Sequence, residues 1–318
     1  PVVPTAALTA IEPGVLRPKL GGQEWSLHML EMVIDARRHN LGGFEVGRVL
    51  PFMKKRMVGP FVFWDHMGPV RLPPHIPRTT DVRPHPHIGL ATVTYLFDGE
   101  MTHRDSLGVE QAIKPGEVNW MTSGSGITHS ERFDGLREKG GLMDGIQAWV
   151  ALPKEMEETD PAFDHYGHND LESYMTDDMG ATLIAGEAFG AKSKVKTHSP
   201  LYYVHTELKA GARTGVPTGH RERAAYVARG KVEYDGHEYG HGQMLVFKPG
   251  GDELAIKAVE STTLMQIGGE PLCERFLWWN FVSSSRERIE QAKADWLAGR
   301  FKLPTHDDKE FIPLPEEP

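Results

Sequence analysis

The sequence predicts an all-β protein built from two similar small barrels in tandem, with a short helix near the C-terminus. From Leu27 to about Val150, short apolar segments alternate with Gly, Pro, Asp and Asn, which is the pattern of strands separated by turns. No long amphipathic stretch interrupts this half, so helices are not expected to cover it. Strand-like segments resume after Asp178, and a closed barrel or a sandwich is the architecture that such repeated short strands favour.

The second run of strands repeats features of the first. Residues 95–99 (YLFDG) are followed by 114–118 (KPGEV), and residues 226–230 (YVARG) are followed by 241–245 (HGQML). A duplicated barrel explains this repetition most simply. The alternative is that an aromatic residue, an apolar pair and a turn glycine recur by chance in any all-β chain.

Shifts in composition suggest where each element begins and ends. Residues 153–178 are acidic and rich in turn residues, with little periodicity, so we expect a connector there. The N-terminal stretch has neither a basic segment nor an unbroken apolar run, so it predicts a loose arm rather than a signal peptide. The expected organisation is an arm over residues 1–26, a first barrel over 27–152, a connector over 153–178, a second barrel over 179–282, and a helix and tail over 283–318.

The helix is predicted from its capping residues and its apolar face. Ser284 and Glu287 form a capping box, and Gly299 can follow the last turn. One face of this helix would carry Ile289, Ala292 and Trp296. Residues 302–318 are Pro-rich and acidic, which favours an extended tail or an arm onto a neighbouring chain.

Charge and cysteine content exclude several classes of function. The chain has 35 Lys and Arg against 44 Asp and Glu, a net charge of −9, which has the wrong sign for direct binding to nucleic acid. No apolar run is long enough to predict a membrane span. The single cysteine, Cys273, cannot form an intramolecular disulfide, so we expect a cytoplasmic protein.

The feature that points most directly to chemistry is a pair of His-containing motifs. His85 and His87 are two residues apart just before an apolar strand, a spacing that directs both imidazoles to the same face. About forty residues later, His129 and Glu131 repeat the spacing. If the two strands are neighbours, three imidazoles and one carboxylate converge.

Three nitrogens and one oxygen suit a divalent first-row metal such as iron, manganese, cobalt, nickel, copper or zinc, and suit calcium or magnesium badly. Four protein ligands on an octahedral ion leave two positions open for substrate. A single H-x-H pair in a chain with 16 His would more often be surface histidine, but the second pair favours a metal site. The Gly-rich run at 124–126 lacks the residues of a phosphate-binding loop and is better explained as a tight entry into the next strand.

The segments HPHIGLATVTYLFDGEMTHRDSLG and KPGEVNWMTSGSGITHSE closely resemble the signature of the pirin family, within the cupin superfamily. The resemblance continues through LIAGEAFGAKSKV, LYYVHTELKAGA and IGGEPL, and so covers about three quarters of the chain. It implies two cupin barrels (double-stranded β-helices) in tandem, with one metal, typically Fe(II), in the first. By motif position, the implied ligands are His85, His87, His129 and Glu131.

Two departures limit what the resemblance implies. Many relatives have a Glu just after the H-x-H motif, where this chain has Ile-Gly-Leu-Ala-Thr, so Glu131 would be the one carboxylate ligand. In the second barrel, His220, His237 and His241 do not repeat the spacing, so this barrel is expected to bind no metal. Arg221 or His237 could still contribute to a site there, without further support.

Pirin-like proteins include quercetin 2,3-dioxygenases, so the resemblance implies an enzyme that opens a flavonol ring with O₂ and releases CO. Metal binding would lower the pKa of the flavonol 3-hydroxyl, and Glu131 would accept its proton as general base. Such a substrate needs an apolar wall, although aromatic residues near a barrel are more often part of its core. The candidate residues for this wall are Phe61, Phe63, Trp64, Trp120, Met121 and Met143.

The alternative hypothesis is a metal- or redox-sensing interaction protein, since other pirins regulate a transcription factor or a metabolic enzyme without turnover. A change from Fe(II) to Fe(III) would alter the surface over the site. His103, Arg104 and Asp105 are candidate rim residues, and an ordinary solvated turn is the simpler interpretation of them. A metal with a purely structural role ranks last, because structural sites are usually closed by protein ligands.

Overall fold

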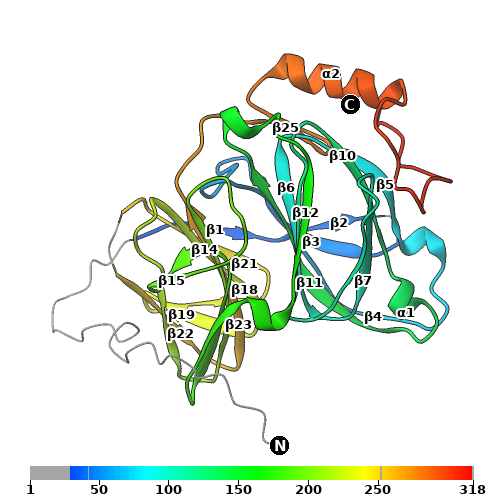
Figure 1. The fold of residues 1–318 in the computed structure, drawn as a ribbon. Coiled ribbons are helices and arrows are strands. Elements are labelled where there is room, and N and C mark those ends of the chain that lie inside the picture. The colour runs from blue at the N-terminus through cyan, green and yellow to red at the C-terminus, as the bar shows by residue number, and fades with distance from the viewer. Residues whose placement is uncertain (1–28, 42, 251–252, 317–318) are drawn as a thin grey trace, which may run out of the picture.

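The computed structural model describes residues 29–41, 43–250 and 253–316, and it confirms two β-barrels in tandem (Figure 1). Each barrel combines a large sheet with a small one, and the two large sheets lie against each other. The expected N-terminal arm lies outside the described residues. No helix in the described part of the chain is long and apolar enough to cross a membrane.

The first barrel has a large sheet of strand order β12-β9-β6-β11-β4-β3-β2 and a small sheet of order β5-β10-β7-β8. The strands of the large sheet are β2 (Arg37–Asn40), β3 (Glu45–Leu50), β4 (Phe61–Leu72), β6 (Leu90–Asp98), β9 (Val118–Thr122), β11 (Gly141–Ala151) and β12 (Ala162–Tyr166). Those of the small sheet are β5 (Val82–His87), β7 (Met101–Asp105), β8 (Glu110–Ile113) and β10 (Ile127–Arg132). Short helical turns are α1 (Asp134–Arg137) and the 3-10 turns Arg78–Thr80, Lys154–Met156 and His168–Asp170.

The second barrel has a large sheet of order β1-β21-β18-β23-β16-β14-β13, with β15 beside β14, and a small sheet of order β17-β22-β19-β20. The strands of its large sheet are β1 (Leu30–Asp35), β13 (Glu172–Met175), β14 (Met179–Ala188), β15 (Ala191–Lys192), β16 (Leu201–Leu208), β18 (Glu222–Arg229), β21 (Gln243–Phe247) and β23 (Thr262–Gly269). Those of the small sheet are β17 (Arg213–Val216), β19 (Lys231–Tyr234), β20 (His237–Gly240) and β22 (Leu254–Ala258).

The two barrels share one topology. In each small sheet the first strand along the chain pairs with the fourth, and the fourth pairs with the second. The large sheets also correspond strand by strand, with β4, β6 and β11 at the places that β16, β18 and β23 occupy in the second barrel. This identity of strand order supports the duplication that the sequence suggested.

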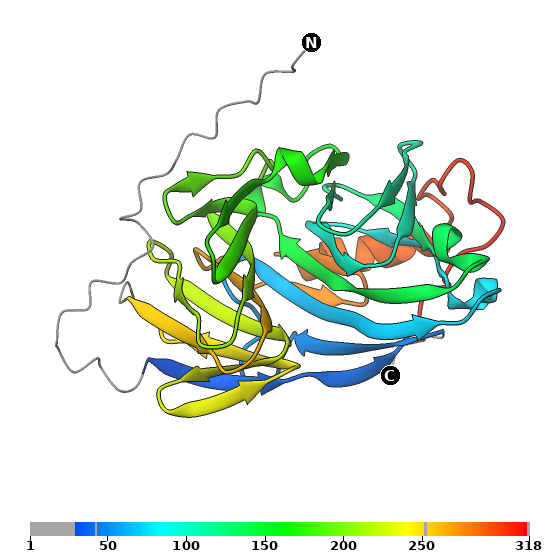
Figure 2. The same ribbon diagram turned by 90° about the horizontal axis from the view of Figure 1, so that it is seen from below.

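The two barrels exchange more strands than the expected domain boundaries allowed. Strand β1, which we placed in the first barrel, pairs with β21 and completes the large sheet of the second (Figure 2). Within the expected connector, β12 extends the first barrel by pairing with β9, and β13 extends the second by pairing with β14. Short edge strands carry little apolar pattern of their own. Their place is fixed by pairing with a distant strand, so the sequence pattern did not assign them to a barrel.

A continuous apolar core fills the space between the large sheets, with Trp64, Tyr203 and Tyr226 in edge-to-face contact at its centre. Buried polar groups cross the same interface. Asp144 accepts a hydrogen bond from His66 Nε2 at 2.6 Å and pairs with Arg229 from the second barrel. The barrels are therefore joined by both packing and a buried ionic network.

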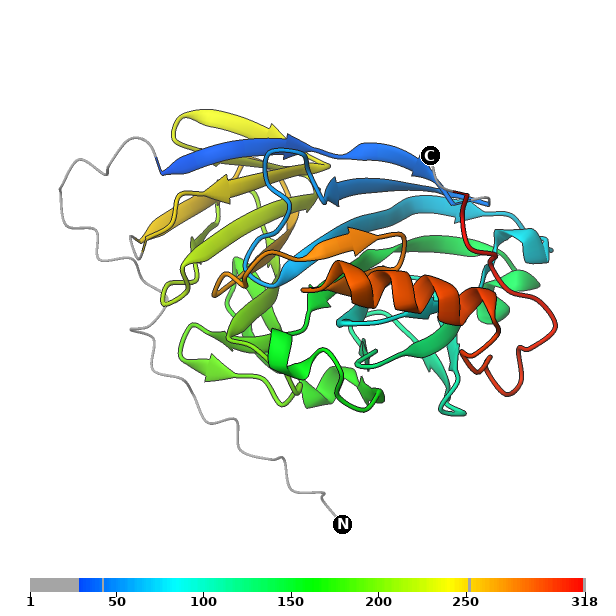
Figure 3. The same ribbon diagram turned by 90° about the horizontal axis from the view of Figure 1, so that it is seen from above.

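A C-terminal hairpin and helix pack on the first barrel. The hairpin comprises β24 (Phe276–Trp278) and β25 (Phe281–Ser283), and the helix is α2 (Arg286–Leu297) (Figure 3). The side chain of Ser285, one residue after the expected cap, accepts the hydrogen bond from Arg288 N. The apolar face is as predicted, since the helix buries Ile289, Ala292 and Trp296.

Candidate metal centre

The structure places the two His-containing motifs on neighbouring strands. Strands β5 and β10 pair antiparallel, and His129 lies directly opposite His85. The pairing shifts register between His129 and Glu131, at a β-bulge. Alternation along β10 directs His129 and Glu131 into the barrel and leaves Ser130 and Arg132 on the outer face.

Glycines allow close approach of the chain at the entrance to these strands. Gly124 has φ +49°, and a Cβ there would lie 2.0 Å from the carbonyl oxygen of Thr159. Gly89 has φ +68°, and its Cβ would lie 2.0 Å from the carbonyl oxygen of Val282. The close approach supports the interpretation of residues 124–126 as a tight strand entry.

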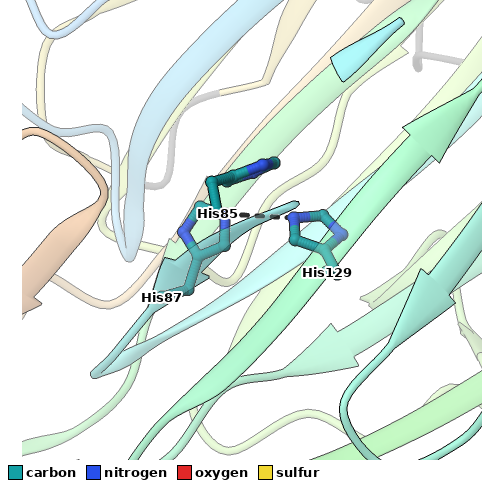
Figure 4. Close-up of side chains that lie close together, drawn as sticks. All are labelled: His85, His87 and His129. Atoms are coloured by element: carbon teal, nitrogen blue, oxygen red, sulfur yellow. Dashed lines mark hydrogen bonds between the residues drawn. The ribbon is translucent and has the colours of Figure 1, made fainter. Parts of the chain in front are cut away.

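The imidazoles of His85, His87 and His129 converge on one point inside the barrel (Figure 4). One ring nitrogen from each lies within 4.8 Å of the others, and the Nε2 atoms of His87 and His129 are 3.1 Å apart. All three side chains are buried. Their arrangement gives a compact set of three nitrogen donors.

Backbone carbonyls fix which nitrogen of the first two rings carries the proton. His85 Nδ1 lies 2.8 Å from the carbonyl oxygen of Arg83, and His87 Nδ1 lies 3.1 Å from that of Asn280. Because a carbonyl can only accept, each Nδ1 must donate, and each Nε2 keeps its lone pair. The lone pairs are on the side that faces the cluster.

His103 and Asp105 form a hydrogen-bonded relay that fixes the proton of His129 on Nδ1. Asp105 is fully buried and accepts a hydrogen bond from His103 Nε2 at 2.9 Å. His103 Nδ1 is then the acceptor for His129 Nδ1, 3.3 Å away. Asp105 also accepts from the backbone N–H groups of Leu107 and Val109, which holds the carboxylate in place. The result is a lone pair on His129 Nε2 as well.

The relay corrects our expectation for residues 103–105. We expected rim residues or a solvated turn, but His103 and Asp105 are buried in strand β7. Arg104 alternates with them and forms ion pairs with Glu110 and Asp134 on the outer face. The signal was present in the sequence, because His103 and Asp105 show the same i, i+2 spacing as the predicted ligand pairs.

The donor set fits a divalent transition metal. Burial lowers the pKa of His85 to about 4 and the pKa values of His87 and His129 well below the usual range, so all three rings are neutral at pH 7. Two Nε2 lone pairs facing each other at 3.1 Å repel, and a bound cation would relieve that repulsion. Neutral imidazoles favour first-row transition metals over calcium or magnesium.

Glu131 lies in the same cavity but outside the group of three. Its carboxylate is not among the atoms within 4.8 Å of one another, although its side chain lines the cavity into which the imidazoles face. Burial raises the pKa of Glu131 to about 7. A carboxylate in this environment is a stronger base than an exposed one.

The cavity above the imidazoles has a volume of about 760 Å³. Phe63 and Trp149 stack at 3.9 Å along its wall, and the Trp149 ring meets His87 edge to face. Arg48 covers the Phe63 ring and is fixed by two hydrogen bonds to Asp65, of 2.8 and 2.7 Å. Trp149 and Arg48 thus cover the two faces of the Phe63 ring, and a flat aromatic ligand would meet an aromatic wall and a cation in this cavity.

Of the six wall residues proposed from the sequence, Phe63 lines this cavity. The other five are buried elsewhere, mostly in the cores of the barrels and of their interface: Phe61, Trp64, Trp120, Met121 and Met143. Trp149 was missed. It lies on β11 outside both motifs, and only the pairing of β11 with β4 places it against Phe63.

Comparison with known proteins agrees with this geometry. Residues 43–150 match the pirin domain, and residues 203–302 match the pirin C-terminal cupin domain. The chain belongs to the pirin family. A pirin-like protein of Caulobacter vibrioides is 63% identical over 289 residues, which cover 91% of this chain and all of that protein.

Two solved structures extend the comparison to three dimensions. A crystal structure of quercetin 2,3-dioxygenase from Acinetobacter baumannii superimposes with a TM-score of 0.83 at 34% identity, covering 90% of this chain and 95% of that one. A second structure of a quercetin 2,3-dioxygenase from the same organism gives a TM-score of 0.81 at 29% identity, covering 86% and 98%. The fold of this pirin, including both cupin barrels, is thus shared with proteins described as quercetinases.

Proposed function

We propose that this pirin is a mononuclear metal enzyme, a quercetin 2,3-dioxygenase that opens the ring of a flavonol with O₂ and releases CO. The observation that carries the proposal is the convergence of three Nε2 lone pairs beneath a cavity with a stacked aromatic wall. The named activity of the Acinetobacter baumannii structures supports the same reaction. The single, exposed cysteine supports a cytoplasmic location.

His85, His87 and His129 would hold the metal, with Glu131 as the fourth ligand, and Fe(II) is the metal we propose. When bound, the metal supplies a Lewis acid that polarises the flavonol 3-hydroxyl and a redox centre for reaction with O₂. Manganese, cobalt, nickel, copper and zinc suit the same donor set. Metal availability in the cell then decides which ion occupies the site.

The residues of the chain bind and orient the substrate. The Phe63 and Trp149 rings give the flavonol an apolar aromatic wall in the cavity. Glu131 is placed to accept the proton of the 3-hydroxyl, and its raised pKa makes it an effective base near neutral pH. O₂ then oxidises the deprotonated flavonol, both oxygen atoms enter the ring-opened product, and CO leaves.

The test is anaerobic reconstitution with Fe(II) of the wild type and His87→Ala in parallel, with metal content measured first. Quercetin and air are then added while its absorbance and the headspace CO are followed. We expect the wild type to consume quercetin and release CO, and His87→Ala to do neither. Glu131→Gln is the next variant, and we expect it to retain flavonol binding while losing turnover.

A wild type that binds one metal tightly but leaves quercetin intact would contradict the proposed reaction. In that case the metal- and redox-sensing alternative becomes the function to test. The assay would then be binding of protein partners to the Fe(II) and Fe(III) forms.

A further inference from the structure

The C-terminal tail, residues 304–316, lies on the first barrel of its own chain. It follows α2 and runs across the end of that barrel beside the metal cavity (Figure 3). The pirin C-terminal cupin domain match ends at residue 302, so the tail lies beyond the part of the chain that the family match covers. Residues 304–316 form no helix or strand, as expected of an extended tail, and they contact the first barrel of their own chain.

One end of the tail is fixed to the outer face of a ligand strand. Asp307 accepts hydrogen bonds from Arg132 Nε at 2.6 Å and Arg132 Nη2 at 2.7 Å, and a third from Ser130 Oγ at 2.6 Å. Ser130 and Arg132 alternate along β10 with His129 and Glu131. The same strand therefore carries the metal cluster on one face and the tail on the other.

The other end of the tail is fixed to the second ligand strand and to the helix. Ile312 N donates to the carbonyl oxygen of Pro84 on β5 at 2.8 Å, and the carbonyl oxygen of Ile312 accepts from Trp296 Nε1 at 3.1 Å. Phe311 meets the Trp296 ring edge to face at 5.4 Å. Strand β5 is an edge strand of the small sheet, so the tail also covers an unpaired sheet edge.

Two residues of the tail also line the cavity itself. Glu310 and Ile312 line it together with Phe63, Trp149 and Glu131. Glu310 Oε1 lies 3.1 Å from Arg132 Nη2, which fixes this second carboxylate at the cavity wall. The cavity is therefore incomplete without a segment that lies outside the family match.

We propose that the tail is a specificity-determining wall of the metal cavity, held closed by Asp307 on Arg132. Glu310 accepts a hydrogen bond from a ring hydroxyl of the ligand, and Ile312 packs against its rings. The tail thus selects polyhydroxylated flavonols over flavonols that carry the 3-hydroxyl alone, and it limits access to the metal. The identity of the ligand rests on the proposed function, while the closure of the cavity does not.

The experiment compares the wild type with Asp307→Asn, Glu310→Gln and a chain truncated after Leu303. Asp308→Asn is the matched control, because Asp308 is an exposed neighbour that forms an ion pair with Lys309 at 3.4 Å. Each Fe(II)-loaded protein is mixed anaerobically with ferrozine to measure the rate of metal extraction. Anaerobic titrations with quercetin and with 3-hydroxyflavone give two dissociation constants without turnover.

We expect Asp307→Asn and the truncated chain to lose Fe(II) to ferrozine about tenfold faster than the wild type, with Asp308→Asn unchanged. The wild type should prefer quercetin over 3-hydroxyflavone by about tenfold, Glu310→Gln should weaken that preference, and truncation should abolish it. Circular dichroism checks that each variant is folded. If the truncated chain does not fold, the extraction rate of Asp307→Asn alone tests the closure, and the flavonol preference of Glu310→Gln alone tests the specificity.

If Asp307→Asn and the truncated chain both lose Fe(II) at the wild-type rate, the proposal that the tail closes the cavity is wrong. A preference for quercetin that survives truncation would overturn the role in specificity. If neither flavonol binds the metal-loaded wild type, the proposed reaction fails instead, and the ferrozine rates still decide whether the tail closes the site.

Discussion

The two barrels have the same strand order but very different interiors. In the first, β5 and β10 place three histidines and a glutamate around a cavity of about 760 Å³. In the second, the corresponding strands β17 and β22 contribute Val216, Leu254 and Ile256 to a buried apolar cluster. The fold therefore supplies a frame, and the inward residues of two strands decide whether it presents a set of metal-binding donors or an apolar core.

The large sheets differ in how they accommodate a buried glutamine. Gln147 on β11 accepts a hydrogen bond from Thr94 at 2.8 Å and lines the cavity. At the corresponding strand of the second barrel, both amide atoms of Gln266 are buried without a hydrogen-bond partner among the described residues. An amide thus faces the interior of both barrels, but only the first gives it a partner.

The largest expected effect is removal of a proposed metal ligand from the first barrel. We expect His85→Ala to weaken metal binding by more than about 100-fold, beyond the 10–100-fold typical of losing a supporting residue. Thr214→Ala on β17, the strand that corresponds to β5, should leave metal binding unchanged. Metal titration of both variants checks this, and equal affinities would remove the functional contrast between the barrels.

The relay behind His129 should have the next largest effect. Asp105→Asn removes the anion that orients His103, and we expect metal affinity to fall about 10–100-fold. Glu233→Gln on β19, the strand that corresponds to β7, is the matched control and should have no effect. Competition against a chelator of known affinity measures both. Unchanged affinity in Asp105→Asn would mean that the relay does not support the metal.

The interface that joins the barrels should contribute to stability rather than to metal binding. Asp144→Asn weakens the pairing with His66 and Arg229 in a fully buried position, and we expect unfolding free energy to fall by about 1–3 kcal/mol. Asp98→Asn, which pairs with Arg229 at a partly exposed position, should cost less than about 1 kcal/mol. Urea denaturation monitored by fluorescence compares them, and the reverse order would contradict the importance of the buried pair.

The smallest expected effect concerns the two glutamines. Gln266→Leu should be neutral or stabilise the protein by up to about 1 kcal/mol, because it replaces amide atoms without partners. Gln147→Leu should destabilise by about 1 kcal/mol, because Thr94 loses its acceptor. Thermal unfolding of both variants provides the measurement. A larger loss in Gln266→Leu would show that its amide has partners in solution.

Local patterns were enough to predict the parts of the site that lie on one strand. The i, i+2 spacing placed His85 and His87 on one face, and the second motif gave His129, because alternation along a strand is a property of the chain itself. The repeat of turn residues similarly predicted two barrels. Helix α2 was predicted from its apolar face, and its cap differed by one residue because Ser284 and Ser285 are adjacent.

Contacts between distant segments could not be predicted in this way. Trp149 reaches the cavity through pairing of β11, and β1 joins the second barrel through pairing with β21. The tail is Pro-rich and acidic, and this composition predicts neither its contact with Arg132 nor its place beside the cavity. These positions depend on contacts with distant segments, which a local sequence pattern does not identify.

The hydrogen bond from His87 to Asn280 joins residues 193 positions apart. During synthesis, all three histidines leave the ribosome well before the carbonyl that fixes the proton of His87. A nascent first barrel thus contains all three histidines, but it lacks the carbonyl group that orients the His87 ring. Metal affinity should therefore rise late, when the C-terminal hairpin docks, so that loading of the ion reports completion of the whole chain rather than of the barrel that holds it.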